Sequence, residues 1–386
     1  MQGLVLDTEQ KTAFVKDIPI PEPGAGEVLI QVYTVALNPI DPLYVHNPLG
    51  ATGRTVGSDF AGIINKLGEA VPSTSGLKEG QRVAGFLQGA CSVNERPGSF
   101  AEYAVAPWDL VWRVPSTLSF EEAATKNLCG LTAAQAVFFR LGLPAPFTWK
   151  GKEEEDRIRK WAKKEVYFFI AGASTSVGMY AAQLVRRSAE VNGATIRLLG
   201  AASKQRFSLL KSEPYGYDDL VDYRNNDWVE HIRALTGGKG VDFAYDCISE
   251  GNTVKTVSET LNNSGNMAIV RSREGNAWNA EDLPVEPIYG AVWEGLGIEI
   301  QYQGFTVPTS PEARAFAVAF FKWLSEGGEL SANPVRLMPG GLDSIVKDGF
   351  LLLGPGSMED REHTRTESWM RPISAEKLVY RVGEWN

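Results

Sequence analysis

The spacing of the hydrophobic positions separates a strand-rich first part of the chain from a second part with a different order of elements. Up to about residue 130, short apolar stretches are separated by turns rich in Pro and Gly, such as residues 19–24 and 78–80. The strand candidates are residues 4–6, 14–16, 28–33, 61–67, 82–86 and 100–105. Many short strands without long helices between them predict a small, partly open β-barrel.

From residue 165 to about 300, strands alternate with helices of about ten residues. The predicted strands are residues 166–170, 195–199, 220–222, 241–247 and 266–271, and the helices between them are residues 177–187, 205–211, 228–235 and 254–261. This order is typical of βαβ units with right-handed crossovers. The sequence therefore predicts an α/β domain with a parallel, Rossmann-type sheet.

The C-terminal part predicts a return to the first domain. An amphipathic helix at 311–325 is followed by a second helix at 342–352, a polar loop at 354–371 and a last strand at 377–381. A final strand needs a sheet to join, and the N-terminal barrel offers one. The predicted domains are residues 1–130 with 330–386, and residues 131–329. A mixed-sign charge run within 145–164 predicts a solvated insertion before the first parallel strand.

The turn after the first parallel strand has the residue types of a phosphate-binding loop. Residues 166–170 suit a strand buried on both faces, and the small residues at 171–176 allow a bulky anion to approach the backbone. The helix that follows presents unpaired N–H groups and the positive end of its dipole to this turn. Only Gly172 and Gly178 stand near the positions of the full dinucleotide fingerprint. The turn by itself is therefore equally compatible with a fold that binds nothing there.

The end of the second parallel strand favours NADPH over NADH. An acidic side chain at this point accepts hydrogen bonds from the free ribose hydroxyl of NAD, whereas a 2′-phosphate needs cations or hydroxyls. Here Ser203, Lys204 and Arg206 follow the strand without an acid among them. They are the candidate 2′-phosphate ligands. The alternative is a Ser N-cap and two ordinary surface cations at the start of a helix.

Composition and charge limit the classes of function. Of the 386 residues, 44% are hydrophobic and 22% are charged, as in soluble globular proteins. The net charge of −9 argues against general binding to nucleic acid or to anionic membranes. The three cysteines and three histidines show no ligand spacing, so we expect no metal site and three buried thiols. The N-terminus lacks the pattern of a signal peptide, which predicts a reducing, cytoplasmic setting.

Six motifs in chain order resemble the medium-chain dehydrogenase/reductase superfamily. They are ALNPID at 36–41, GSDFAG at 57–62, EGQRV at 79–83, GSFAEY at 98–103, AGASTSVG at 171–178 and AEKLVY at 375–380. Within the superfamily the chain is most similar to zinc-independent enoyl and quinone reductases, above all to the fungal trans-acting enoyl reductases of polyketide assembly lines. The resemblance implies a GroES-like catalytic barrel, a doubly wound Rossmann domain, an active site in the cleft between them, and NADPH as hydride donor.

The resemblance also implies roles for individual residues. The expected pyrophosphate contacts are Ser174, Thr175, Ser176 and Val177. Tyr223 resembles a tyrosine that completes the 2′-phosphate site, and Lys377 lies in a strand that contacts the cofactor in the family. Thr132 resembles a threonine near the nicotinamide. For Tyr223 and Thr132 the alternatives are an edge-strand aromatic residue and a helix N-cap.

The family's catalytic positions show two departures. Zinc-dependent alcohol dehydrogenases carry a Cys ligand near Asn38 and a His ligand in the motif where this chain has Ser58, so the resemblance implies a reaction without metal. The candidate catalytic residues are Thr132, Asp41 and Tyr44. Related reductases often carry an aromatic residue or lysine where this chain has Leu43. The proton donor therefore stays open among Tyr44, His46 and solvent.

The expected activity is NADPH-dependent reduction of a polarised C=C bond in an enoyl thioester on a polyketide carrier protein. Two alternatives remain: a quinone or alkenal reductase that acts on free small molecules, and an NADPH-binding protein without catalytic activity. A polyketide synthase is the candidate protein partner, and the protein is expected to be a monomer or a dimer. Basic groups for an acidic carrier protein lie within 150–164 and at Arg361, Arg365 and Arg371.

Overall fold

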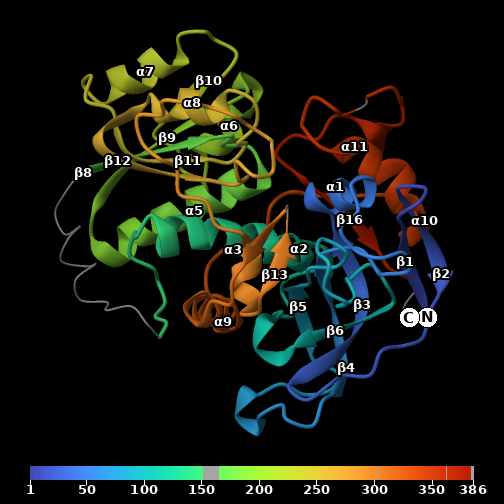
Figure 1. Cartoon of the computed structure of the whole chain (residues 1–386). Coiled ribbons are helices and arrows are strands. Elements are labelled where there is room, and N and C mark those ends of the chain that lie inside the picture. Colours follow the sequence, from blue (N-terminus) through green and yellow to red (C-terminus); the bar gives the residue numbers. More distant parts are fainter. Residues whose placement is uncertain (151–164, 303, 362, 384–386) are drawn as a thin grey trace. The chain divides into compact units, whose positions relative to one another are not determined.

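The computed structural model places the strands mainly in two larger sheets, one in each of two units (Figure 1). The structure describes residues 1–150, 165–302, 304–361 and 363–383. Unit 1 consists of Met1–Leu128, Ile298–Thr309 and Phe321–Asn386, and unit 2 consists of Cys129–Gly297 and Ser310–Phe320. Unit 1 thus includes residues 298–309 and 321–329, which the sequence pattern placed with the parallel sheet. The predicted domain limits stay a prediction.

Unit 1 is built on a seven-stranded sheet. Six of its strands follow the order β15-β16-β3-β4-β5-β7, and the seventh, β6, pairs with β3. The strands are β3 (Glu27–Ala36), β4 (Asp59–Leu67), β5 (Arg82–Phe86), β6 (Tyr103–Pro107), β7 (Val111–Arg113), β15 (Val335–Leu337) and β16 (Lys377–Arg381). A hairpin of β1 (Gln2–Asp7) and β2 (Thr12–Asp17) accompanies this sheet. Apolar side chains that include Val28, Ile30, Phe60 and Val83 form its core.

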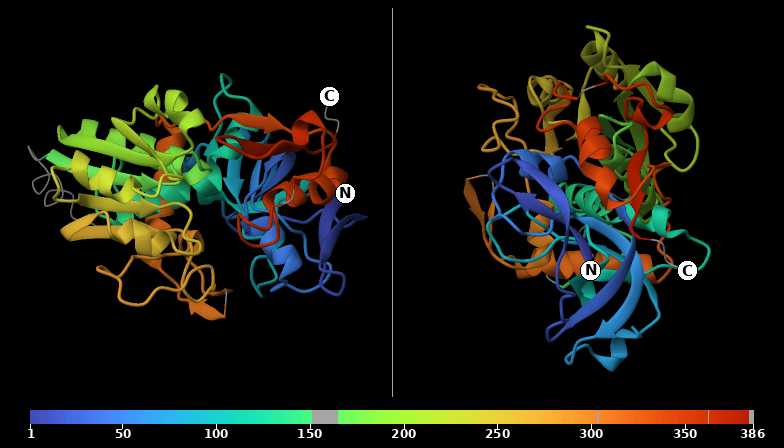
Figure 2. Two further views of the ribbon diagram at one scale, coloured as in Figure 1. Left: turned by 90° about the horizontal axis from the view of Figure 1, so that it is seen from above. Right: turned by 90° about the vertical axis from the view of Figure 1, so that its right-hand side faces the viewer.

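The last strand joins the N-terminal sheet, as predicted. β16 pairs antiparallel with β3, with Tyr380 opposite Val35. In both views of Figure 2 the red C-terminal segment lies beside the blue N-terminal strands of unit 1. The N-terminal and C-terminal segments of the chain therefore build one sheet and share one core.

Unit 2 contains the predicted parallel sheet, with the strand order β10-β9-β8-β11-β12. Its strands are β8 (Glu165–Ala171), β9 (Thr195–Ala202), β10 (Asp219–Asp222), β11 (Val241–Asp246) and β12 (Leu261–Ile269), and its helices include α5 (Ser176–Asn192), α6 (Phe207–Lys211), α7 (Trp228–Leu235) and α8 (Thr253–Ser258). In Figure 1, α5 lies below the strands and α7 above them. The central strand β8 is apolar because helices cover both faces of the sheet. The α/β fold class is confirmed.

Two helices differ in detail from the prediction: one ends earlier, and one contains a π-helical turn. The helix expected at 254–261 stops at Ser258, because the Asn-rich segment that follows favours extended backbone; Asn262 there donates to the Asp242 carboxylate at 2.9 Å. The helix expected at 342–352 contains a π-helical turn, Ile345–Phe350. A Cβ on Gly349 in this turn would lie 2.4 Å from the Leu37 side chain, so a larger residue would require Leu37 to shift within the core.

Two helices connect the units along the chain. The helix α3 (Asn127–Ala134) contains the boundary between Leu128 and Cys129, and α9 (Pro311–Ser325), found where it was predicted, contains the boundary between Phe320 and Phe321. Most of the predicted charged insertion falls at 151–164, outside the described residues. Among the helices that the structure describes, none combines the length and apolar character needed to span a membrane.

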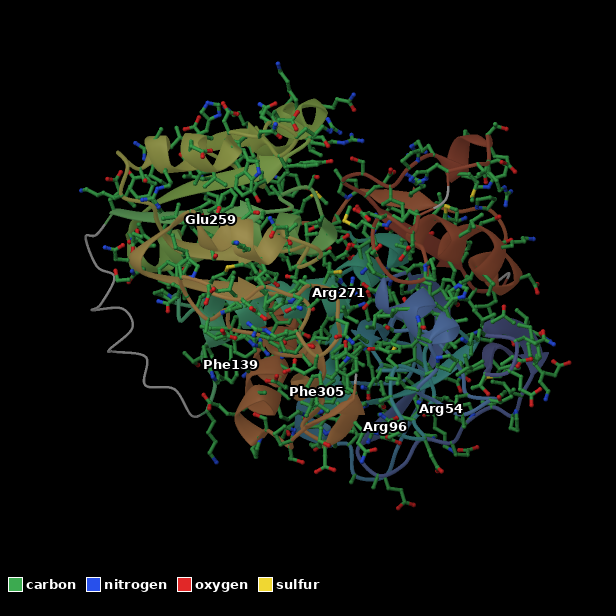
Figure 3. All side chains as sticks on the ribbon, turned by 45° about the horizontal axis from the view of Figure 1, so that its top comes forward. Arg54, Arg96, Phe139, Glu259, Arg271 and Phe305 are labelled. Atoms are coloured by element: carbon green, nitrogen blue, oxygen red, sulfur yellow. The ribbon has the colours of Figure 1, made fainter. Side chains whose placement is uncertain are left out.

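One arginine holds an irregular loop of unit 1 in place. The guanidinium of Arg54 donates to the backbone carbonyls of Gly89, Ser92 and Arg96, the last at 2.7 Å. Figure 3 labels Arg54 and Arg96 in this part of the structure. The loop buries Cys91, one of the three predicted buried thiols. Carbonyl groups in such a non-repetitive segment need donors, and Arg54 supplies them.

Replacing Arg54 with methionine should therefore lower the stability of unit 1. The three charged hydrogen bonds that are lost, at about 1.5 kcal/mol or more each, correspond to about 4 kcal/mol or more, and we expect the melting temperature to fall by several degrees in calorimetry. Arg54→Lys keeps the charge but has fewer donors, so its loss should be intermediate. Lys66→Met removes a surface ion pair with Glu22 in the same unit and serves as the control. A methionine variant with the same melting temperature as the wild type would contradict this role of Arg54.

Candidate active site

The predicted phosphate-binding turn lies between β8 and α5 in unit 2. Thr175 is the N-cap of α5, and its side chain accepts a hydrogen bond from the N–H of Gly178 at 3.0 Å. Ser174, Ser176 and Val177 flank it and are half-buried. The structure thus brings all four predicted pyrophosphate contacts together at the first turn of a 17-residue helix. Such a helix start favours an anion through its N–H groups and its dipole.

Glycines allow the helix and the turn to approach closely. A Cβ on Gly178 would lie 2.4 Å from the carbonyl oxygen of Gly172, and Gly172 itself has a positive φ of 72°. Both positions therefore require glycine. The small-residue turn, the capped helix start and this close packing fit the pyrophosphate of a dinucleotide. The residues present are thus suited to the cofactor that the sequence pattern predicts.

The predicted 2′-phosphate ligands lie at the carboxyl ends of neighbouring strands. Ser203 directly follows β9, Lys204 and Arg206 form the next turn, and Tyr223 follows β10, which pairs with β9. Lys204 is exposed, Ser203 and Arg206 are half-buried, and the Tyr223 side chain is 54% exposed. Parallel neighbours bring their carboxyl ends to the same edge of the sheet, which is where a dinucleotide fold binds its ligand.

Sequence reasoning missed one cation at this edge. The guanidinium of Arg224 donates to the Ser203 hydroxyl at 3.2 Å and lies 5.3 Å from the centre of the Tyr223 ring. It also lies 3.8 Å from the carboxylate of Asp222. The signal was present in the sequence, because Arg224 directly follows the tyrosine that the family resemblance singles out. What the sequence could not give was its hydrogen bond to Ser203, which depends on the pairing of β9 and β10.

The candidate catalytic residues Asp41 and Tyr44 lie on α1 (Ile40–His46) in unit 1. Asp41 is buried and accepts two hydrogen bonds of 2.7 Å, one from the Ser58 hydroxyl and one from the backbone N–H of Asn38. Burial raises the pKa of Asp41 to about 7, although these two hydrogen bonds oppose the increase. Tyr44 is buried, with its ring 5.7 Å from that of Tyr302.

The remaining candidates lie elsewhere. Thr132 is half-buried on α3, in unit 2. Lys377 is buried in unit 1, where its ammonium donates to Asp59 at 2.5 Å and to the side chain of Asn38 at 3.0 Å. A role for Lys377 in cofactor binding stays a prediction. Burial lowers the pKa of His46, so its imidazole is neutral at pH 7 and a weak proton donor.

The two positions that correspond to zinc ligands in the family are engaged within unit 1. The amide of Asn38 donates to Asp59 at 2.9 Å, and the hydroxyl of Ser58 donates to Asp41. Among the residues that the structure describes, no group of three or more His, Cys, Asp or Glu side chains is placed to hold a metal ion. The donors at these two positions are an amide and a hydroxyl, in place of the thiolate and imidazole that zinc prefers.

Comparison with known families agrees with the two folds. The family model described as "Alcohol dehydrogenase GroES-like domain" matches residues 24–116, and the model described as "Zinc-binding dehydrogenase" matches residues 176–314. The second match covers none of the positions discussed above for zinc. A solved alcohol dehydrogenase superfamily protein from Novosphingobium aromaticivorans covers 99% of this chain, and this chain 100% of it, with a TM-score of 0.72 at 17% identity. A GroES-like domain joined to a nucleotide-binding domain defines the class of NAD(P)-dependent oxidoreductases.

Similar curated proteins narrow the class of oxidoreductase further. The trans-enoyl reductase ACTTS2 of Alternaria alternata is 30% identical over 95% of each chain, and the trans-enoyl reductase traG of Penicillium crustosum is 28% identical over 98% of this chain and 96% of its own. The solved structure of CurK enoyl reductase has a TM-score of 0.69 at 19% identity, with 99% of each chain covered. The chain belongs to the medium-chain dehydrogenase/reductase superfamily and, within it, to the trans-enoyl reductases.

The raised pKa of Asp41 predicts a pH dependence of stability. In the unfolded chain this carboxyl ionises near 3.8, whereas in the folded protein it keeps its proton up to about pH 7. The folded state is therefore favoured at low pH, and this advantage, on the order of 4 kcal/mol at most, is lost between pH 4 and 7. In Asp41→Asn the amide can accept from Asn38 and donate to Ser58 without titrating. Its melting temperature should fall less between pH 4 and pH 8 than that of the wild type.

The control for this comparison is Asp343→Asn, because Asp343 is exposed. Its melting temperature should follow the wild-type pH profile. The buried Asp246, whose pKa burial also raises, is present in all three proteins and cancels from the comparison. Parallel profiles for Asp41→Asn and wild type would show that Asp41 does not titrate in this range.

Proposed function

We propose that this protein is an NADPH-dependent enoyl reductase that acts in trans on an α,β-unsaturated thioester carried by a polyketide synthase. The observation that carries this proposal is the similarity to trans-enoyl reductases over nearly the full length of both chains. The two alternatives, a quinone or alkenal reductase and a protein without catalytic activity, gain no comparable support from the described site.

The proposed reaction assigns distinct tasks to the residues of the candidate active site. Bound NADPH supplies a hydride for the β-carbon of the substrate. The turn with Ser174–Val177 would hold the pyrophosphate of the cofactor. The negative charge that develops on the thioester oxygen needs hydrogen-bond donors, and the α-carbon needs a proton. Thr132, Asp41 and Tyr44 are the candidates for these two tasks. Of the three, Asp41 has a pKa raised to about 7, so it carries a proton at and below neutral pH.

NADPH is the proposed donor because of the charges at the ends of β9 and β10. Ser203, Lys204, Arg206, Tyr223 and Arg224 offer two hydroxyls and three cations where NAD-specific sites have an acid. Asp222 partly balances Arg224. A phosphate dianion would restore the balance of charge at this edge of the sheet.

Two of the basic groups that were expected to bind the acidic carrier protein are already paired with carboxylates of this chain. Arg365 donates to Asp348 at 2.6 Å and also pairs with Glu367, and Arg371 donates to Glu376 at 2.6 Å. These arginines therefore do not form a patch of free positive charge. The other basic candidates fall mostly at 151–164, outside the described residues. The oligomeric state and the cytoplasmic location stay predictions.

The cofactor assignment predicts selective effects on NADPH. Arg224→Gln and the double change Lys204→Ala with Arg206→Ala should each raise the KM for NADPH by roughly tenfold or more, the size of one charged hydrogen bond, and leave the KM for NADH unchanged. Arg197→Gln is the matched control, since Arg197 lies on the same strand β9 but pairs only at the surface with Glu165 and Asp218. An equal loss for both cofactors would refute the 2′-phosphate assignment.

The activity itself is tested by NADPH consumption with a panel of acceptors. The panel contains enoyl pantetheine thioesters of increasing length, a simple enone and a quinone, together with a primary alcohol in the presence of NADP. We expect the largest kcat/KM for the thioesters. A preference for the quinone or the free enone would favour the alternative reductase. Tight NADPH binding without turnover of any acceptor would favour the protein without catalytic activity.

A further inference from the structure

The carboxylate of Asp59 is completely buried and bonds to three separate segments of unit 1. Its Oδ2 accepts hydrogen bonds from the Lys377 ammonium at 2.5 Å and from the Asn38 amide at 2.9 Å. Its Oδ1 accepts a hydrogen bond from the backbone N–H of Leu128 at 2.8 Å. Asp59 therefore joins the loop before α1, the last strand β16 and the start of α3.

The bond to Leu128 makes Asp59 a cap for α3. The first N–H groups of a helix have no acceptor within the helix, and a carboxylate there also interacts favourably with the helix dipole. Most caps come from the adjoining residue, but Asp59 comes from 69 positions earlier in the chain. The helix start is held a second time through Asn127, whose side chain accepts from the Trp112 indole at 2.7 Å and donates to the Phe60 carbonyl at 3.1 Å. The first turn of α3 is thus fixed to the sheet of unit 1.

Lys377 makes this arrangement possible because a buried carboxylate needs a compensating charge. The side chains of Lys377 and Asp59 are 3% and 0% exposed. The partners of its ammonium include Asp59, the Asn38 side chain at 3.0 Å and the Thr125 carbonyl at 3.4 Å. The charge of Lys377 is therefore already engaged by a buried carboxylate.

The helix that Asp59 caps also carries Thr132. Leu128 and Thr132 lie about one turn apart on α3, and the boundary between the two units falls between them. An ordered first turn therefore favours helical order in the rest of α3, which includes Thr132. The hydrogen bonds of Asp59 and Lys377 named above lie within unit 1, and α3 is the element that links them to Thr132.

We propose that Asp59 and Lys377 are positioning residues that fix the start of α3 and, through it, Thr132, and that Lys377 is the counter-ion of Asp59 instead of an NADPH ligand. The proposal rests on the proposed function for the catalytic role of Thr132. It assigns Lys377 a different role from the one that the family resemblance implies.

Two double variants separate the cap from the charge. Lys377→Met with Asp59→Asn removes both charges but keeps a carbonyl oxygen for the Leu128 N–H. Lys377→Met with Asp59→Leu removes both charges and the cap, with a side chain of similar size. We expect the first double variant to retain kcat within about threefold of wild type, and the second to lose about tenfold or more. NADPH affinity, measured by fluorescence titration, should stay within about twofold of wild type in both.

A second readout does not depend on activity. Hydrogen exchange of the peptide that covers α3 should be slow in wild type and in the Asp59→Asn double variant, and faster in the Asp59→Leu double variant. The control is Arg381→Met with Glu121→Gln, which removes an ion pair on the surface of unit 1, where the Arg381 side chain is 65% exposed. This control should change neither exchange nor kcat.

The outcomes separate this proposal from the proposed function. If wild type reduces none of the acceptors, the proposed function fails, and exchange at α3 with NADPH affinity still decides the roles of Asp59 and Lys377. If the double variant Lys377→Met with Asp59→Asn weakens NADPH binding by about tenfold or more, Lys377 is a cofactor ligand and the proposal is wrong. The proposal is also overturned if the Asp59→Leu double variant keeps wild-type exchange and wild-type kcat.

Discussion

The N–H groups at the start of a helix need acceptors, and this protein satisfies the need differently at its two functionally important helices. At α5 the cap is local: Thr175 accepts from Gly178, and small residues leave the turn open to an anion. At α3 the acceptor is a carboxylate from a distant strand, held in the core by a lysine. The first helix start is suited to a ligand, and the second is closed by the protein itself. Both follow from the same requirement.

Two buried carboxylates of unit 1 differ in whether a cation is bonded to them, and this difference explains the raised pKa of one of them. Two carboxylates, Asp41 and Asp59, lie in the same buried cluster, and one ammonium, Lys377, is bonded to Asp59. Asp41 has only neutral donors, Ser58 and Asn38, and the charge of Asp59 nearby also disfavours its ionisation. Its pKa therefore rises to about 7, because burial without a bonded cation favours the neutral acid. The same cluster thus contains one carboxylate bonded to an ammonium and one whose pKa burial raises to about 7.

The sequence predicted those features that depend on local pattern. The alternation of strands and helices in unit 2 is visible in short windows, and the return of β16 to the first sheet follows from the need of a last strand for a partner. The end of α8 and the π-helical turn within the 342–352 helix were not predicted, because Asn262 and Gly349 act through contacts with other parts of the fold. The hydrogen bond of Arg224 to Ser203 and the burial of Lys377 against Asp59 depend on residues 21 and 318 positions apart. Such contacts leave no periodic trace in the sequence.

Reduction of an activated double bond without a metal makes geometry more important than chemical activation. A hydride can pass only over a short, defined distance, so the acceptor carbon and the donor must be held with little freedom. A surface ion pair would contribute little to this, because solvent screens it and its long side chains are mobile. A buried pair such as Asp59–Lys377 is costly to desolvate and adds little net stability over an apolar pair. It does, however, impose directional bonds at fixed distances on three segments at once. A fixed first turn of α3 is a reason to retain such a pair in the interior, where an apolar pair would pack well but would leave the start of α3 without an acceptor.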